Sequence, residues 1–198
     1  MSTLNQTNIH IIQNDQEAIN AAYQLADFAL EQRNLRDQQR VLPTDVIQQL
    51  TQKGLTGIRI PKTYGGAFVS NKTLSHVFRI LAKADANVGQ IPQNHFYALE
   101  VLRNTGTVQQ KQKLYAEVLK GARFGNALAE FKTKNSTQKY STISTTNDGF
   151  EVNGEKFYCT GSLFAHRIPS LVKNAEGREF LAFIPRESEG LELIDDWS

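Results

Sequence analysis

The residue best suited to proton transfer is His95, which lies in a polar and aromatic cluster at residues 93–97. Histidine changes charge near neutral pH, so a histidine facing a ligand could donate or accept a proton. The cluster also lies where a helix is expected to begin, and a helix-capping histidine with aromatic core neighbours fits it equally well. His10, His76, His95 and His166 are not at metal-ligand spacing, so no metal site is expected.

A second candidate is the segment 158–162, which carries the hydroxyl groups of Thr160 and Ser162 and several backbone N–H groups. Such groups could hold a flavin ring or an oxidised intermediate, although they are equally common where a strand passes into a loop. Cys159 has only Lys156 as a basic neighbour in sequence, and we expect a buried, inert thiol there.

The common nucleotide-binding and hydrolytic motifs are missing from the sequence. It contains no GxGxxG, no P-loop, no HExxH and no GxSxG. The sequence therefore gives no support for a Rossmann or Walker nucleotide site, for zinc-dependent hydrolysis, or for a nucleophile elbow.

Composition indicates an ordinary soluble protein of one or two domains. The net charge is only +2 and the basic residues are dispersed, so nucleic acid is not an expected partner. One cysteine permits no intramolecular disulfide, which favours a reducing compartment, and a cytoplasmic protein is expected. The N-terminus resembles no signal peptide, and no apolar run has the roughly 20 residues that span a bilayer.

The elements that would position these residues change in kind along the chain. Apolar residues recur at spacings of three and four from about 15 to 119, which predicts helices, with loops at 54–57 and 61–66. Helix starts are predicted near Pro43 or Thr44 and at Ser70. We place a domain boundary between residues 121 and 122.

The second half has the composition of a β-domain. Residues 140–146 are rich in β-branched side chains, and Asn153-Gly154 predicts the two-residue turn of a hairpin within 150–158. A second strand pair is predicted at 170–172 and 179–185, and a further strand at 190–194.

Four motifs, in this order, resemble those of the acyl-CoA dehydrogenase superfamily: PKTYGG at 61–66, ADANVG at 84–89, GNALAE at 125–130 and NGEKFYCTG at 153–161. The resemblance implies an α+β fold with an all-helical N-terminal domain (1–121) and an incomplete acyl-CoA dehydrogenase-type middle β-barrel (122–198). It also implies that the C-terminal four-helix domain, which builds most of the homotetramer interface in that fold, is absent.

One departure separates the chain from the thioester dehydrogenases. Glu130 is followed by FKTKNS, where those enzymes usually have Pro-x-Ala-Gly-Ser-Asp. Four short motifs resemble instead the reduced-flavin monooxygenase branch: Asn-His at 94–95, Gly-Asn-Ala at 125–127, Cys-Thr-Gly at 159–161 and Asp-Asp-Trp at 195–197. That branch includes dibenzothiophene monooxygenase and the sulfur-acquisition oxidoreductase family, and we favour the latter.

This resemblance implies roles for four residues. His95 matches a histidine proposed to act in oxygen activation or proton transfer. Asn126 and Thr160 match positions near the isoalloxazine ring that stabilise its oxygen adduct, and Trp197 matches an aromatic residue at the flavin. The desulfurising enzyme of this branch has serine at the position of Thr160. Threonine keeps the hydroxyl group, and its added methyl group narrows the choice of side-chain rotamer.

The implied reaction uses FMN, reduced by a separate flavin reductase, with O₂ and a small organosulfur substrate. Two alternatives stay open. One is an FAD-dependent acyl-CoA dehydrogenase, whose catalytic glutamate usually lies in the C-terminal domain. The other is a truncated, non-catalytic fragment with exposed apolar faces and free strand edges. Flavin binding and oxygen consumption with organosulfur rather than acyl-CoA compounds would separate the three.

Overall fold

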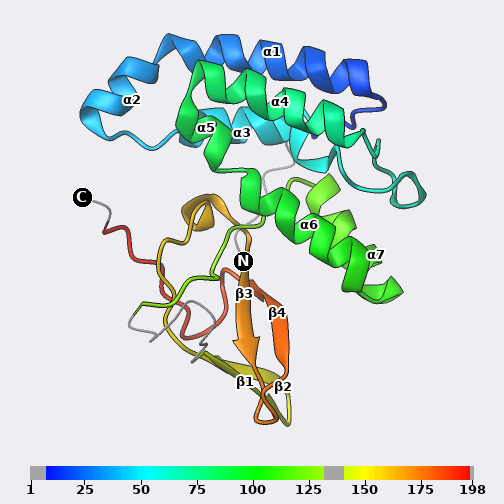
Figure 1. Cartoon of the computed structure of the whole chain (residues 1–198), viewed down its shortest axis with the longest axis vertical. Helices are drawn as coiled ribbons and strands as arrows, with labels where there is room; N and C mark the ends of the chain where they lie inside the picture. Colours follow the sequence, from blue (N-terminus) through cyan, green and yellow to red (C-terminus); the bar gives the residue numbers. More distant parts are fainter. Residues whose placement is uncertain (1–7, 132–140, 197–198) are drawn as a thin grey trace. The chain divides into compact units, whose positions relative to one another are not determined.

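The computed structural model describes residues 8–131 and 141–196, which divide into two compact units at Arg123 and Phe124. The first unit is helical and the second contains the strands (Figure 1). The helices of the first unit are α1 (Asp15–Glu31), α2 (Arg33–Gln39), α3 (Thr44–Gln52), α4 (Asn71–Ala84), α5 (Ala86–Gln90), α6 (Gln93–Thr105) and α7 (Val108–Leu119).

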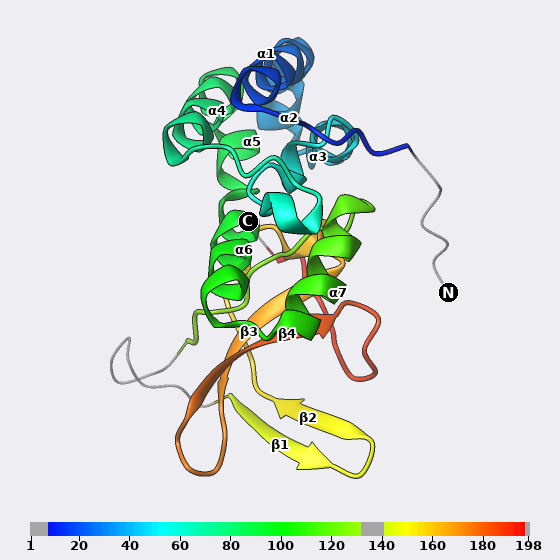
Figure 2. The same cartoon turned by 90° about the vertical axis from the view of Figure 1, so that its right-hand side faces the viewer.

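Helices α1 and α4 lie side by side in both views of the chain (Figures 1 and 2), and α1 also packs against α3. Their alanine and leucine stripes are buried, as the helical spacing predicts, with Ala22, Leu25 and Ala29 fully inaccessible to solvent. Ser70 caps α4 by accepting a hydrogen bond from the Thr73 N–H. Thus the predicted helical character and the start of α4 are confirmed.

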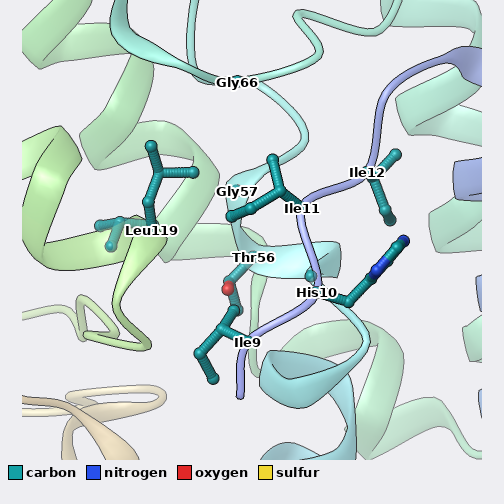
Figure 3. Close-up of a pocket in the computed structure, with 10 residues that line it drawn as sticks. Ile9, His10, Ile11, Ile12, Thr56, Gly57, Gly66 and Leu119 are labelled. Carbon is teal, nitrogen blue, oxygen red and sulfur yellow. The ribbon is translucent and has the colours of Figure 1, made fainter.

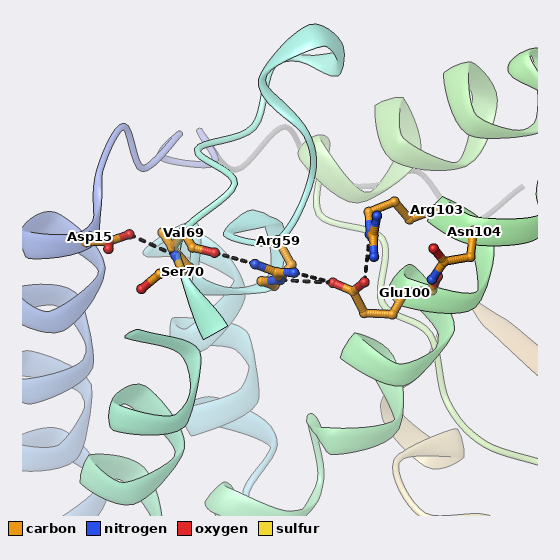
Figure 4. A network of polar contacts seen from close by, with 7 residues as sticks. All are labelled: Asp15, Arg59, Val69, Ser70, Glu100, Arg103 and Asn104. Carbon is orange, nitrogen blue, oxygen red and sulfur yellow. Dashed lines mark hydrogen bonds and ion pairs between the residues drawn. The ribbon is translucent and has the colours of Figure 1, made fainter. Parts of the chain in front are cut away.

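The two predicted loops of the helical unit form single turns of 3₁₀-helix, η1 (Leu55–Gly57) and η2 (Lys62–Tyr64). The chain beyond η2 is fastened by a polar network (Figure 4). In that network the Arg59 guanidinium donates to the Val69 carbonyl and pairs with Glu100 of α6 at 2.6 Å. Glu100 also accepts a hydrogen bond from Arg103. The buried Arg59 thus links the chain at Val69 to α6.

The second unit contains a four-stranded sheet in the order β2-β1-β3-β4. Its strands are β1 (Thr142–Thr146), β2 (Gly149–Asn153), β3 (Arg167–Lys173) and β4 (Glu179–Pro185). β1 pairs antiparallel with β2, β3 pairs antiparallel with β4, and β1 meets β3 in parallel where Thr142 lies opposite Lys173. The predicted pairing of the last two strands is therefore confirmed.

Two strand predictions are wrong. The first hairpin turns at residues 147–148 and not at Asn153-Gly154, since Thr146 pairs with Gly149. Gly154 instead follows the end of β2, where it passes too close to Ser141 for any side chain. The segment 190–194 forms no strand among the described residues, although Leu191 and Leu193 pack against the core formed by Ala127, Ala165 and Ile168. Its alternation reflects an extended chain lying on that core rather than pairing in a sheet.

Gly154 gives a first testable prediction. A Cβ at Gly154 would lie 2.2 Å from Ser141 Oγ, whereas Gly149, with a similar φ (+148° against +155°), has no atom within 4 Å of its ideal Cβ. Gly154→Ala should therefore lower the free energy of unfolding by about 1–3 kcal/mol more than Gly149→Ala does. Urea unfolding of both variants measures the difference. Equal losses would show that Ser141 moves aside without cost.

Candidate functional site

Asn126 lies in an extended segment that runs from Phe124 to Ala129 beside β3. Its neighbours Gly125 and Ala127 donate hydrogen bonds to β3 carbonyls at 2.9 and 3.0 Å. At the far end of the segment, Ala129 accepts from the Phe157 N–H at 3.0 Å. Asn126 is thus fixed between β3 on one side and the chain leading to Thr160 on the other.

Ser162 holds the Asn126 backbone from both sides. Its Oγ accepts from the Asn126 N–H at 3.2 Å and donates to the Asn126 carbonyl at 2.8 Å. The Asn126 side-chain amide donates to the Tyr158 carbonyl at 3.4 Å, and Thr160 donates its N–H to the same carbonyl at 2.8 Å. The structure therefore brings Asn126 and the half-buried Thr160 together around one turn of the chain.

The Asn126 side chain leaves one polar atom without a partner. Its Oδ1 is buried and accepts no hydrogen bond from the part of the chain that the structure describes. A buried acceptor without a donor costs about 1–3 kcal/mol, which a ligand N–H or O–H group could recover. This atom fits a flavin, whose ring carries N–H donors at its edge.

Tyr158 has a positive φ of +54°, which is unfavourable for a bulky side chain. The residue is 60 % exposed, so burial does not explain the conformation. Strained residues of this kind concentrate at ligand sites, where the surrounding contacts hold them. Cys159, next to it, packs against the small core of this unit, and burial raises the pKa of its thiol, as expected for an inert cysteine.

His95 belongs to the helical unit, where it is the third residue of α6, and only 2 % of it is exposed. Its Nε2 lies 2.9 Å from the Thr56 carbonyl, which can only accept, so Nε2 carries the proton. Burial lowers the pKa of His95 to about 4, against the opposing effect of the Thr56 hydrogen bond, and the charge of Arg123 lowers it further. His95 is therefore neutral at pH 7.

A small pocket in the helical unit lies beside Thr56 (Figure 3). The chain before α1, including Ile9 and Ile12, forms one wall, and Gly57 and Leu119 contribute to the others. The Thr56 hydroxyl is buried and has no partner among the described residues. None of the residues expected to form the flavin site lines this pocket, so it is not that site.

Trp197, the fourth expected site residue, lies outside the described residues. The sequence suggested the Ser162 hydroxyl only as part of the candidate segment 158–162, and gave no sign of its two hydrogen bonds to the Asn126 backbone. Across residues 8–131 and 141–196, no group of three or more His, Cys, Asp or Glu side chains is placed to hold a metal ion. Over the same ranges no helix is long and apolar enough to cross a membrane.

Curated relatives share part of this chain. It is 27 % identical to dibenzothiophene monooxygenase of Rhodococcus qingshengii over 157 residues, which cover 76 % of this chain and 38 % of that enzyme. It is 31 % identical to 3-sulfinopropanoyl-CoA desulfinase of Cupriavidus necator over 117 residues, 58 % of this chain and 30 % of that enzyme. The chain thus spans well under half the length of these relatives.

Solved structures have the same fold over nearly all of the chain. FMN-bound TdsC from Paenibacillus sp. A11-2 superposes with a TM-score of 0.85 at 26 % identity and covers 91 % of this chain and 47 % of its own. Methanesulfinate monooxygenase MsuC from Pseudomonas fluorescens gives a TM-score of 0.80 at 23 % identity, covering 91 % and 46 %. The helical unit followed by a small sheet is consistent with an incomplete acyl-CoA dehydrogenase-like fold.

The sequence profile of one family matches residues 14–122, which is more than half of the chain. Its description is acyl-CoA dehydrogenase, N-terminal domain, and the match covers α1 through α7. We conclude that this chain belongs to the acyl-CoA dehydrogenase N-terminal domain family.

Proposed function

We propose that the protein is a flavin-dependent monooxygenase that uses reduced FMN and O₂ to oxidise a small organosulfur compound. The observation that carries the proposal is the buried, unpartnered Oδ1 of Asn126 beside the turn that contains Thr160. The sulfur-compound monooxygenases among the relatives and the FMN-bound TdsC support it. Reduction of FMN by a separate reductase, assembly as a homotetramer and a cytoplasmic location are parts of the same proposal.

In this proposal each site residue has a distinct task. FMN, once reduced and bound, would supply the electrons that split O₂ into one oxygen atom for the sulfur compound and one for water. Asn126 accepts a hydrogen bond from the ring edge through Oδ1, and the Thr160 hydroxyl donates to the oxygen that gains negative charge. Trp197 contributes an aromatic face to the flavin. These groups act by orientation and by stabilising charge.

For His95 the proposal is proton transfer through Nδ1, because the Nε2 proton is donated to Thr56. The low pKa keeps this imidazole neutral at pH 7, so a proton accepted at Nδ1 would be held only briefly and passed on readily. His95 therefore acts as the base of a proton relay in this scheme, and the Thr56 carbonyl fixes its tautomer and the orientation of its ring.

Oxygen uptake tests the proposed activity. The protein is mixed with anaerobically reduced FMN and then with O₂, in the presence of an aryl sulfide, an alkyl sulfinate or an acyl-CoA thioester, and the products are identified by mass. We expect oxygen uptake to be coupled to the addition of one oxygen atom to the aryl sulfide or the alkyl sulfinate, and not to the thioester. In a separate anaerobic incubation with oxidised FAD as the electron acceptor, dehydrogenation of the thioester would support the acyl-CoA dehydrogenase alternative. No flavin-dependent reaction under either condition would contradict an enzymatic role for this chain.

Thr160 provides a matched pair of variants for the same assay. Thr160→Val removes the hydroxyl while keeping the branched shape, and should lower kcat by about 10²-fold if the hydroxyl stabilises developing charge. Thr160→Ser retains the donor and should keep most of the native kcat. If the valine variant turns over like the native protein, Thr160 has no part in the reaction.

A further inference from the structure

Next to the Asn126 segment lies a buried ion pair between Glu130 and Lys156 of the second unit. The side chains of the two residues are 3 % and 9 % exposed, respectively. The Lys156 ammonium donates to Glu130 Oε1 and to the Leu171 carbonyl at 2.6 Å. The same carboxylate oxygen accepts from the Ser141 N–H at 3.1 Å. These hydrogen bonds satisfy two charges that would be costly to bury alone.

The pair joins the chain segments that carry the proposed site residues. Glu130 ends the segment that contains Asn126, Lys156 begins the segment that contains Thr160, and Leu171 belongs to β3. The N–H of Leu171 donates to the Ala127 carbonyl at 3.2 Å, so β3 is bonded to the Asn126 segment as well. One ammonium group thus contacts two of these segments and lies at the start of the third.

The turn that carries Thr160 needs support on both sides. Its first residue, Tyr158, has the unfavourable positive φ, and a strained residue persists only where neighbouring contacts enforce it. After the turn, the two hydrogen bonds of Ser162 to Asn126 fix the chain. Before the turn, the fixed points are the Phe157–Ala129 hydrogen bond and, one residue earlier, Lys156 with its two buried acceptors.

We propose that Glu130 and Lys156 are positioning residues for Asn126 and Thr160, an inference that rests on the proposed function. Glu130 follows Asn126 by four residues, and Lys156 precedes Thr160 by four. Because Ala129 and Phe157 pair in antiparallel orientation, the ion pair lies on the same side of Asn126 and of Thr160. A buried ion pair adds little net stability compared with apolar packing, but it fixes geometry through directional bonds. Support of this kind around ligand-contacting groups commonly affects affinity by about tenfold or more.

The test compares two acid-to-amide substitutions in buried ion pairs. Glu130→Gln leaves the Lys156 charge without its counter-charge, and Asp85→Asn does the same to Arg36 in the helical unit, where both side chains are 5 % exposed. Both should lower the melting temperature. Binding of anaerobically reduced FMN should weaken about tenfold in Glu130→Gln and stay native in Asp85→Asn. The backbone amides of Asn126 and Thr160 should exchange with deuterium faster in Glu130→Gln only.

Each result decides one claim. Native FMN affinity and native amide exchange in Glu130→Gln would overturn the positioning role, and so would faster exchange without any loss of affinity. Equal loss of affinity in both variants would mean that general destabilisation, and not positioning, weakens binding. If the unsubstituted chain binds no reduced FMN, the proposed function fails, and unchanged exchange at Asn126 and Thr160 in Glu130→Gln would separately reject the structural part of this inference.

Discussion

Replacing Asp85 by alanine is expected to lower the free energy of unfolding of the helical unit by about 3–5 kcal/mol. Asp85 Oδ2 accepts from Arg36 Nε at 3.0 Å and lies 2.9 Å from Nη2, and both side chains are almost fully buried. Without the carboxylate, the buried Arg36 guanidinium keeps its hydrogen bond to the Ala29 carbonyl but loses its counter-charge. The variant also removes the cap that accepts from the Asn87 N–H at the start of α5.

A double variant separates the buried charge from the packing. Arg36→Met combined with Asp85→Asn removes both charges and keeps an oxygen that can cap α5, so it should be more stable than Asp85→Ala alone. Urea unfolding followed by circular dichroism at 222 nm measures both. A loss below about 1 kcal/mol in Asp85→Ala would mean that water reaches Arg36 easily, and that the pair does not fasten α2 to the junction of α4 and α5.

His95 should make the stability of the helical unit depend on pH. Its pKa falls from the ordinary 6.5 to about 4 in the folded chain, so the unfolded chain binds the proton more readily. This contribution to stability is fully present above about pH 6.5, and declines as the pH falls towards 4. Over that range the shift corresponds to about 3 kcal/mol of unfolding free energy.

Unfolding by urea at several pH values between 7 and 4.5 measures this dependence. His95→Gln keeps an amide donor for the Thr56 carbonyl but cannot titrate, so its unfolding free energy should fall less steeply as the pH decreases. The comparison uses the slopes, because a slope does not depend on any change that the substitution makes to the stability at pH 7. Equal slopes for the two proteins would contradict a buried, neutral His95.

Sequence patterns predicted the helical unit well because its information is local. The apolar spacing of α1 and the Ser70 cap of α4 each depend on residues within a few positions of one another. The prediction of a turn at Asn153-Gly154 was wrong. This position needs a glycine because the backbone passes close to Ser141, which lies 13 residues earlier in the sequence. A glycine signals a special backbone position but does not identify its neighbour.

The site shows the same limit. The family resemblance directed attention to Asn126 and Thr160, and the structure places them around one turn. The contacts of Ser162 with Asn126 and of Lys156 with Glu130 were not expected, because they span 36 and 26 residues of sequence. The residue types gave no warning, since a serine after a glycine and a lysine in a strand-rich segment are ordinary. Only the folded chain shows that these side chains contact the segments that carry Asn126 and Thr160.

Binding of reduced FMN by the chain tests the central claim most directly. Anaerobic isothermal titration calorimetry should show saturable binding that weakens at least about tenfold in Asn126→Ala, because the flavin loses the partner of its ring edge. Asn153→Ala, an exposed asparagine at the end of β2, should bind like the native chain. Equal affinities for all three proteins, or no saturable binding by the native chain, would contradict a flavin site at Asn126.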